Sequence, residues 1–494
     1  MNTYLFYDLE TTGLSKAFDQ VLQFAAIRTD MNLNEIERHN LMVKLRPDII
    51  PSPGAMITHR ISIAQSMQGI SEFEAMAQIH HLMNQPNTVN LGYNTSSFDD
   101  EFLRFCFHRN LLPPYTHQYQ NGCRRSDLLP LTIMYYLYKR EVLAHWPERD
   151  GKPTMRLEHL SEANQLASGA THNAMVDTEA TLELARRLRT ESKMWQYLEG
   201  YFEKDTDRKR IEKIPISFQS IAGTNRIALM INNEYGSANQ YQVPVLLIGN
   251  SIPYKNQTLW LRLDNPKLHE IQATDIPTET SSSEQKERFS KNSWVIRKKY
   301  GEPAIVLSPE QRYWNHLSEE RQALVEQNKD WLQSHTTIFN QIIQYHCEYQ
   351  YPKTPDLDIE AALYQNDFLS KKEQAISRQF HAASVSEKIP IVNQFADIEQ
   401  RQLASRLLCR NYPDNNLPPH LTKDFEDYLR RVNPKNEEEA YFDQKHQKRT
   451  TPAVALNEID RLEKESELDS EQIQLLEELE AYIKQHFPTP VEES

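Results

Sequence analysis

The chain has 494 residues and a formal net charge of −14, with 39% hydrophobic and 25% charged residues. This length predicts about three domains, and the hydrophobic content is sufficient for their cores. The cysteines are far apart and form no CxxC pair, which argues against a zinc site and against a disulfide framework: Cys106, Cys123, Cys347 and Cys409.

The apolar runs are too short for a membrane helix. Val243 to Ile248 is among the longest, far below the ~20 residues that cross a bilayer. The N-terminus enters a strand-like run directly, without the charged leader and apolar stretch of a signal peptide. We therefore expect a soluble protein of the reducing cytoplasm, with no membrane association.

Half of the negative charge lies near the C-terminus. Residues 461–494 hold ten acidic and three basic residues, a net charge of −7. The other 460 residues share the remaining −7, which leaves room for local basic surfaces. Candidates are Arg124 with Arg125, residues 204–213 and residues 297–299. A solvated face is the simpler interpretation of each, so charge alone does not exclude a nucleic-acid partner.

The first chemical feature is the run Thr-Tyr-Leu-Phe-Tyr-Asp-Leu-Glu-Thr-Thr-Gly at residues 3–13. Its apolar part predicts a buried strand that ends at Asp8 and Glu10. Because strand side chains alternate between faces, both carboxylates point the same way and Leu9 points into the core. Such a pair suits a hard cation such as Mg²⁺. Two solvated acids at a strand end are the alternative interpretation.

The following residues predict an α/β domain. Strands are expected at 21–29 and at 88–93, and residues 41–45 are expected to form the end of a third strand between them. Ser71 with Glu74 is a capping box that predicts a helix over 71–83. Further helices are expected over 98–110, after Asp127, and over 157–166 and 177–188. Asp99 and Asp100 thus begin a helix just past a strand, where ligand sites of α/β sheets gather.

From about residue 195 the pattern changes to short strands separated by turn residues. They are expected at 214–218, 226–232, 241–248, 258–263 and 294–306, which is typical of a small β-barrel or sandwich. Residues 274–292 form a polar insert that predicts a mobile loop. Beyond about residue 310, and clearly after Pro355, helix-forming residues dominate. Residues 454–485 predict an amphipathic helix with many acids.

Acids and one histidine of the first domain form an ordered set. It consists of Asp8-Leu-Glu10, then Asp99, then His172 on a loop with Asp177 five residues later at the start of a helix. This set resembles the DEDDh family of 3′→5′ exonucleases. The resemblance implies that all five residues are catalytic and that the four carboxylates hold two Mg²⁺ ions, which Mn²⁺ can replace. Asp100 is the rival of Asp99; we prefer Asp99 because it directly follows the aromatic Phe98.

The implied chemistry is phosphodiester hydrolysis. Two metal ions about 4 Å apart activate a water molecule and stabilise the leaving 3′ oxygen. His172 has an ordinary pKa near ~6.5, which suits a base that accepts the proton of that water. Glu10 is also expected to touch the terminal nucleotide.

A narrower resemblance, to the exodeoxyribonuclease I family, spans almost the whole chain and is densest in its first part. It rests on residues 24–30, 53–54, 92–94, 98–101, 156–160 and 356–368. It implies a ribonuclease H-like exonuclease domain over 1–192, an SH3-like β-barrel domain over 193–350 with the insert at 274–292, and an all-helical domain over 351–494 with an acidic terminal helix.

The same resemblance implies processive digestion of single-stranded DNA to 5′-mononucleotides in DNA repair and recombination. It implies Arg156 as a substrate contact, a monomer, and docking to the acidic C-terminal tail of single-stranded DNA-binding protein. Arg60 departs from the family pattern, which usually has Gly there. The alternatives are an RNA-trimming or proofreading DEDDh nuclease and a non-catalytic DNA-binding scaffold.

Overall fold

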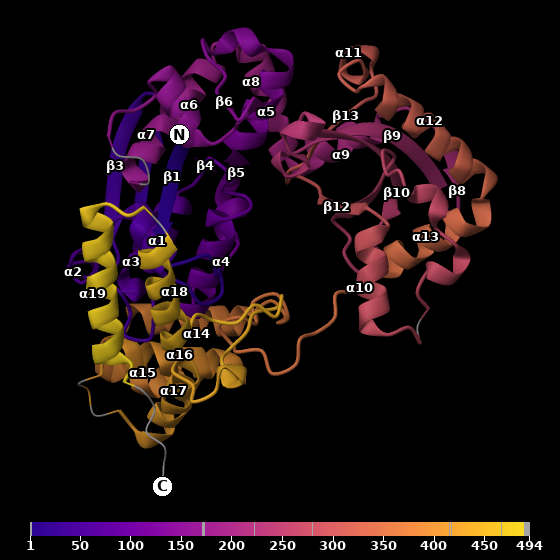
Figure 1. Ribbon diagram of the computed structural model, residues 1–494. Coiled ribbons are helices and arrows are strands. Elements are labelled where there is room, and N and C mark those ends of the chain that lie inside the picture. The colour runs from indigo at the N-terminus through magenta and orange to yellow at the C-terminus, as the bar shows by residue number, and fades with distance from the viewer. Residues whose placement is uncertain are drawn as a thin grey trace. The chain divides into compact units, whose positions relative to one another are not determined.

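The computed structural model describes residues 2–169, 173–221, 223–278, 280–413, 415, 417–465 and 467–488. The chain forms two compact units, each assembled from segments far apart in the sequence (Figure 1). Unit 1 combines residues 1–125, 166–183 and 353–494, and unit 2 combines residues 126–165 and 184–352. The expected helical segment 351–494 therefore lies almost wholly in the same unit as the start of the chain. The domain limits at 192 and 350 stay predictions.

The sheet of unit 1 is mixed and has the strand order β3-β2-β1-β4-β5. Its strands are β1 (Thr3–Thr11), β2 (Val21–Thr29), β3 (Glu35–Met42), β4 (Thr88–Gly92) and β5 (Arg124–Asp127). The central β1 runs antiparallel to β2 and parallel to β4. The expected α/β fold is confirmed, although β3 ends earlier than Leu45.

Strand β1 alternates as its sequence predicts. Asp8 and Glu10 are partly exposed, whereas Leu9 between them is buried. Leu9 packs in one hydrophobic cluster with Phe24 of β2 and Phe102. Because this core fixes the face of Leu9, it also fixes the opposite face on which the two carboxylates lie.

Helices cover the sheet of unit 1. Those before residue 190 are α1 (Pro53–His59), α2 (Ile63–Ser66), α3 (Glu72–Met83), α4 (Asp99–Arg109) and the first part of α7 (Ala174–Leu188). As expected, the Ser71 side chain accepts a hydrogen bond from the Glu74 amide at the start of α3. Helix α4 begins shortly after β4, so the start of α4 lies near the end of that strand.

The C-terminal helices share hydrophobic cores with the first part of the chain. They are α14 (Lys371–Ala382), α15 (Val385–Val392), α16 (Ile398–Asn411), α17 (Pro419–Val432), α18 (Pro452–Glu465) and α19 (Ser470–His486). One cluster joins Tyr428 and Leu479 with Phe18 and Met56. A second joins α14, α15 and α16 with Phe73 of α3. These helices therefore complete the core of unit 1.

A buried network of ion pairs joins the same regions. Arg46 lies 2.6 Å from Asp48 and 3.0 Å from Glu72. Arg410 of α16 lies 3.1 Å from Asp48 and also pairs with Glu360. Burial opposes the ionisation of Glu360, but Arg410, Arg46 and neighbouring Arg406 overcome it and lower the pKa of Glu360. The network thus holds charges that are stable in the core only together.

Unit 2 contains a six-stranded sheet with the order β12-β11-β10-β9-β13, to which β8 adds beside β9. Its strands are β8 (Phe218–Ser220), β9 (Gly223–Ile231), β10 (Gln242–Asn250), β11 (Gln257–Arg262), β12 (Val295–Lys299) and β13 (Ile305–Leu307). The short strands β6 (Glu148–Arg149) and β7 (Lys152–Pro153) pair separately. The expected SH3-like barrel is not confirmed, because the described pairs leave this sheet with two ends.

The sheet of unit 2 is buried on both faces. Leu246 of β10 packs against α12 (Glu319–Ser334) and α13 (Thr336–Glu348), and Val245 packs with Ile211 of α9 (Lys204–Glu212) on the other face. Such burial explains the continuous apolar run of β10. The helices of this unit are α5 (Leu128–Tyr138), α6 (Leu157–Asn164), α8 (Ser192–Glu199), α9 (Lys204–Glu212), α10 (Ser283–Asn292), α11 (Gln311–Trp314), α12 (Glu319–Ser334) and α13 (Thr336–Glu348).

Several expected elements differ from the structure. The predicted mobile loop at 274–292 contains helix α10, which Ser282 and Gln285 begin with a capping box and which Phe289 anchors by its burial. The expected strand at 214–218 starts only at its last residue, and 294–306 divides into β12 and β13. The expected acidic terminal helix is a pair, α18 and α19, because Asp469 caps a new helix.

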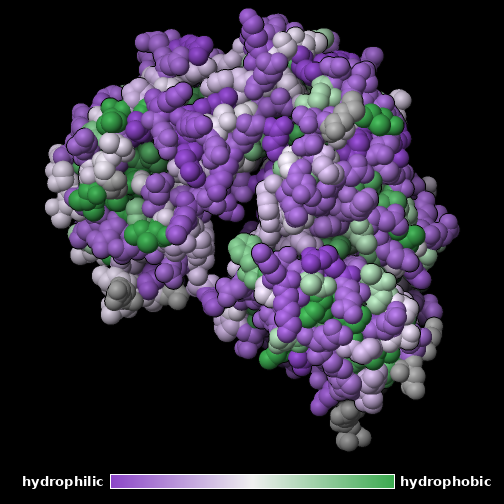
Figure 2. Space-filling view, turned by 180° about the vertical axis from the view of Figure 1, so that it is seen from behind, coloured by the Kyte–Doolittle hydropathy of each residue, from purple (hydrophilic) through white to green (hydrophobic). Residues whose placement is uncertain are grey.

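One face of the molecule is mostly polar. Figure 2 shows one face, on which hydrophilic residues predominate and hydrophobic residues form small separate groups. In the part of the chain that the structure describes, no helix combines the length and the apolar character needed to cross a bilayer.

Replacing one acid of the buried network tests how far unit 1 depends on it. Glu360→Gln is expected to lower the free energy of unfolding by about 3–5 kcal/mol, because Arg410 then lacks part of its compensating charge. Urea unfolding of the full chain measures this. The control is Asp427→Asn, which removes an exposed pair with Arg430 and should change little. Equal effects of the two substitutions would contradict a structural role of the network.

Candidate metal and catalytic site

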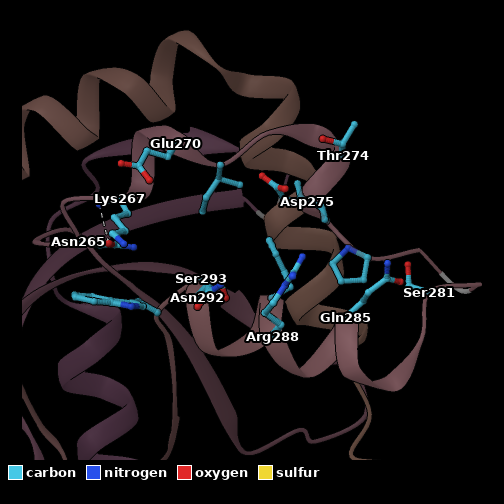
Figure 3. Close-up of a pocket in the computed structure, with 15 residues that line it drawn as sticks. Asn265, Lys267, Glu270, Thr274, Asp275, Ser281, Gln285, Arg288, Asn292 and Ser293 are labelled. Carbon is cyan, nitrogen blue, oxygen red and sulfur yellow. Dashed lines mark hydrogen bonds between the residues drawn. The ribbon is translucent and has the colours of Figure 1, made fainter.

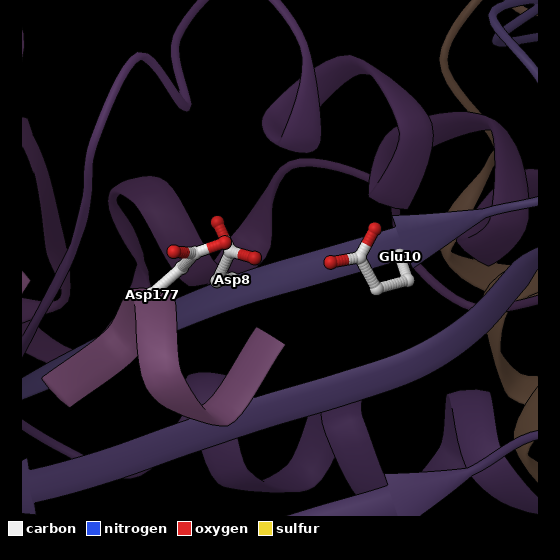
Figure 4. A group of neighbouring side chains, drawn as sticks. All are labelled: Asp8, Glu10 and Asp177. Atoms are coloured by element: carbon white, nitrogen blue, oxygen red, sulfur yellow. The ribbon is translucent and has the colours of Figure 1, made fainter. Parts of the chain in front are cut away.

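Three carboxylates converge in unit 1. Asp8 and Glu10 come from β1, and Asp177 comes from the first turn of α7. One ligand oxygen of each lies within 4.8 Å of the others. Figure 4 shows Asp177 pointing toward Asp8, with Glu10 further along the same strand. The structure therefore brings together three of the residues that the sequence analysis selected.

The local fold explains why Asp177 reaches β1. Thr178, the next residue of α7, is buried, and its hydroxyl lies 3.5 Å from the carbonyl oxygen of Ala25. Ala25 of β2 is the register partner of Asp8. The hydroxyl also donates to Ala174 within the helix. Contact of α7 with β2 thus sets the helix beside the strand that carries the other two acids.

Burial and neighbouring negative charges raise the pKa values of Asp8 and Glu10. Burial raises the pKa of Asp8 well above its ordinary value, and the negative charges of Asp99, Glu10 and Asp177 add to this. Burial, followed by the charges of Asp177 and Asp99, raises the pKa of Glu10 to about 9. A cation placed among these oxygens would remove the repulsion. The donor set, all carboxylate oxygens, fits a hard divalent ion.

Asp99 acts on this cluster from the start of α4. Its side chain is buried, and its charge contributes to the raised pKa values of both Asp8 and Glu10. It is not one of the three acids whose oxygens lie within 4.8 Å of one another. Asp99 is therefore an electrostatic neighbour of the cluster.

Asp100, the rival of Asp99, has a different environment. Its carboxylate accepts a 2.8 Å hydrogen bond from the Tyr7 hydroxyl and lies 3.0 Å from Arg125. Burial opposes its ionisation, but His117, which lies 3.9 Å away, and the charge of Arg125 lower the pKa of Asp100. These contacts give Asp100 a role in holding the start of α4 against β1.

His172 and Arg156 are not tested by the geometry. His172 lies outside the described residues, which resume at Asn173. Arg156 precedes α6 in unit 2, where its side chain is 74% exposed and lies 3.2 Å from Glu158. Their roles in the reaction stay predictions.

Arg60, which departs from the family pattern, keeps a backbone conformation suited to glycine. It ends α1 with φ of 58°, in the left-handed region. Its guanidinium lies 2.6 Å from Asp469 and also pairs with Glu471 at the start of α19. The side chain is thus directed to the C-terminal helix pair, so this arginine accompanies a contact that a glycine could not make.

Lys16 is a neighbour of the site that the sequence analysis did not identify. It lies on the loop after β1, and its ammonium donates to the carbonyl of Ser97 just before α4. Asp99 and Glu101 interact with it by charge. A single lysine in a loop carries no spacing signal, so only the folded chain shows this position.

Unit 2 contains a separate cavity of about 580 Å³ (Figure 3). Its lining includes two basic residues, Lys267 and Arg288, and two acidic residues, Glu270 and Asp275. Because both charge signs are present, the cavity has no clear preference for an anion or a cation. It therefore offers no rival to the carboxylate cluster as a catalytic site.

Comparisons with known proteins give matches in sequence for the part of the chain that carries the cluster. Residues 5–185 match the Exonuclease family. The chain is 39% identical over 201 residues to exodeoxyribonuclease I of Escherichia coli, covering 40% of this chain and 42% of that protein. It is 36% identical over 215 residues to exodeoxyribonuclease I of Haemophilus influenzae, covering 43% and 45% respectively. The matched region thus spans less than half the length of these relatives.

A solved structure extends the likeness in fold. The crystal structure of E. coli Exonuclease I in complex with a dT13 oligonucleotide matches 98% of this chain and 100% of that chain, with a TM-score of 0.81 and 24% identity. At this identity the match shows a shared fold alone. The carboxylate cluster lies on β1 and α7, within the part that also matches in sequence. Residues 5–185 of this chain therefore match the Exonuclease family, and the chain is similar in sequence over about two fifths of its length to exodeoxyribonuclease I.

Proposed function

We propose that the chain is a 3′→5′ exodeoxyribonuclease that degrades single-stranded DNA processively to 5′-mononucleotides. The convergence of Asp8, Glu10 and Asp177 on an exonuclease-family domain carries this proposal. The names of its relatives, and the oligonucleotide bound in the solved structure, support DNA as the substrate. DNA repair and recombination are the processes that such an activity would serve.

We propose Mg²⁺ as the resident ion, in a pair that Mn²⁺ can replace. Asp8, Glu10 and Asp177 would hold it, and Asp99 would complete the set from α4. When bound, the ions supply an activated water and stabilise the leaving 3′ oxygen. The acids fit this role because they are close, partly buried and mutually repulsive.

We assign the remaining roles, proton transfer and substrate contact, to individual side chains. His172 would accept the proton of the attacking water, because a neutral imidazole near its ordinary pKa is an effective base. Glu10 would also contact the terminal nucleotide, and Arg156 would contact the substrate.

Processivity would come from the roughly 300 residues beyond the exonuclease domain. Their phosphate and base contacts would keep the strand bound between cleavage steps. We further propose the acidic tail of single-stranded DNA-binding protein as a partner.

Product analysis on 5′-labelled single strands is the direct test. With Mg²⁺, we expect stepwise shortening from the 3′ end and release of 5′-mononucleotides, with slower digestion of duplex DNA and of matched RNA. Asp8→Asn and Asp177→Asn should each lower kcat by about 10³, because each removes a charged ligand. EDTA should abolish the reaction.

The matched control is Asp460→Asn, an exposed acid on α18, which should keep wild-type kcat. Faster digestion of RNA than of DNA would favour an RNA-trimming enzyme instead. Unchanged hydrolysis in both Asp8→Asn and Asp177→Asn would exclude the cluster as the catalytic centre.

The pKa of Glu10 predicts how the metal-free chain responds to pH. Its folded value of about 9 lies above its ordinary value of 4.5. The cost of ionisation is therefore absent below about pH 4.5 and grows as the pH rises toward 9. Glu10→Gln should accordingly stabilise the EDTA-treated chain by about 1–3 kcal/mol at pH 8 and by little at pH 4, as measured by urea unfolding.

Added Mg²⁺ should reverse the order of stability, so that the wild type becomes more stable than the Glu10→Gln chain. The wild type gains stability on addition of Mg²⁺ because the folded state binds it, and the Glu10→Gln chain gains less. Glu212→Gln, at an exposed glutamate of α9, is the control and should follow the wild type throughout. A gain from Glu10→Gln that is the same at both pH values would contradict the cost of ionising the buried Glu10 as its cause.

His172→Ala tests the proposed base. We expect kcat to fall by about 10²–10⁴ with little change in the Kd for single-stranded DNA. The wild-type kcat should rise with pH until the imidazole is neutral, near ~6.5, and the variant should lack this rise. His269→Ala, at an exposed histidine of unit 2, serves as the control. A variant that keeps the pH dependence would assign the proton transfer to another group.

A further inference from the structure

An exposed group of aromatic rings lies beside α4 in unit 1. Phe368 is 89% exposed and Tyr364 is 43% exposed, both on the segment that leads to α14. The ring of Phe368 meets that of Tyr115 edge to face, with centroids 6.0 Å apart. Edge-to-face packing leaves a face of the Phe368 ring open. We call Tyr115, Tyr364 and Phe368 the aromatic surface.

Contacts with α4 hold this surface in place. The Tyr364 hydroxyl donates to Glu101 and lies 3.4 Å from a guanidinium nitrogen of Arg104. The Arg104 guanidinium carbon is 5.5 Å from the ring centroid of Tyr115. The Gln365 side chain donates to the Thr354 carbonyl at 3.1 Å, which ties down the segment itself. Tyr364 and Phe368 therefore face solvent on a segment that is fixed to the fold, beside the partly buried Tyr115.

Helix α4 connects the aromatic surface to the carboxylate cluster. The helix begins at Asp99, which acts by charge on Asp8. Glu101 and Arg104, which contact the rings, follow within one and a half turns, about 3–8 Å along the axis. Lys16 and Lys445 interact with each other in the same area and add positive charge. A strand whose end lies at the cluster therefore meets rings and cations within a few nucleotides.

We propose that the aromatic surface is a base-stacking site for the single-stranded DNA whose 3′ end occupies the carboxylate cluster. The inference rests on the proposed function and extends it to the nucleotides upstream of the cleaved bond. Exposed rings bind bases of any sequence through their faces, which suits an enzyme without sequence preference. At about 3.4 Å per nucleotide or more, the path along α4 places the stacked base within a few nucleotides of the 3′ end.

Single abasic positions provide the test. The full chain in EDTA is titrated with 5′-fluorescein-labelled dT strands in which one base is missing, at each position from the second to the eighth nucleotide from the 3′ end. Anisotropy gives Kd. For the wild type, a missing base at the stacked position, within a few nucleotides of the 3′ end, should weaken binding about tenfold, which corresponds to about 1.4 kcal/mol.

Phe368→Ala should weaken binding of the intact strand by a similar factor and should abolish the further effect of the missing base. Phe368→Leu, which keeps an apolar side chain without a flat ring, should behave likewise. Ile473→Ala is the control, since Ile473 is 41% exposed on α19 and should keep the wild-type abasic profile. Because Phe368 is so exposed, thermal unfolding should be unchanged in its variants.

The outcomes separate the two proposals. If the wild type digests the strand with Mg²⁺ but the variants bind and respond to abasic positions as the wild type does, the aromatic surface is not a stacking site and the nuclease proposal stands. Equal weakening of intact and abasic strands by Phe368→Ala would also overturn stacking. A wild type that neither binds nor digests single-stranded DNA would overturn both.

Discussion

Repulsion between like charges on a central strand is the constraint around which unit 1 is built. β1 is hydrogen-bonded to β2 on one side and to β4 on the other, so its backbone has little freedom to move the carboxylates apart. The buried Leu9 fixes the facing of Asp8 and Glu10, and α7 adds Asp177 to the same place. Burial, together with this repulsion, raises the pKa values of Asp8 and Glu10. The fold thus forms in advance the site that we propose for a cation, and the chain carries the destabilising effect of these charges when no ion is bound.

The remainder of unit 1 supplies the rigidity that this site needs. The C-terminal helices fill hydrophobic clusters with residues from the first part of the chain. The buried pairs of Arg46, Asp48 and Arg410 join segments more than 350 residues apart in sequence. A buried charge without its partner is costly, so the helical region and the sheet stabilise each other. Arg60 adds an outer connection to α19.

The sequence predicts those elements whose own residues carry the signal. Alternation in β1, the apolar run of β2 and the Ser71 capping box each act over a few residues, and the structure has these elements where expected. Helix α10 was wrongly expected to be a loop, because its stability comes from one cap and from the burial of Phe289 among otherwise polar residues. The packing of the C-terminal helices against α1 and α3 depends on contacts between distant segments, for which no local pattern exists.

The candidate site shows the same difference between what local patterns predict and what depends on contacts between distant segments. Spacing and family resemblance selected Asp8, Glu10 and Asp177, which the fold brings together, but they could not show Lys16 or the environments of Asp99 and Asp100. Those two neighbours are separated by about 100° around α4, since a turn has 3.6 residues. Tyr7 and Asp8 are likewise separated, because strand side chains alternate.

Asp100 accordingly meets Tyr7 and Arg125, which satisfy its charge, whereas the charge of Asp99 raises the pKa of Asp8. An acid whose charge is matched by fixed cations serves the fold. An acid that adds to an existing repulsion is best explained by a cation that binds beside it and compensates its charge. This difference favours Asp99 over Asp100 as the fourth ligand, and it follows from the rotation of one helix relative to one strand.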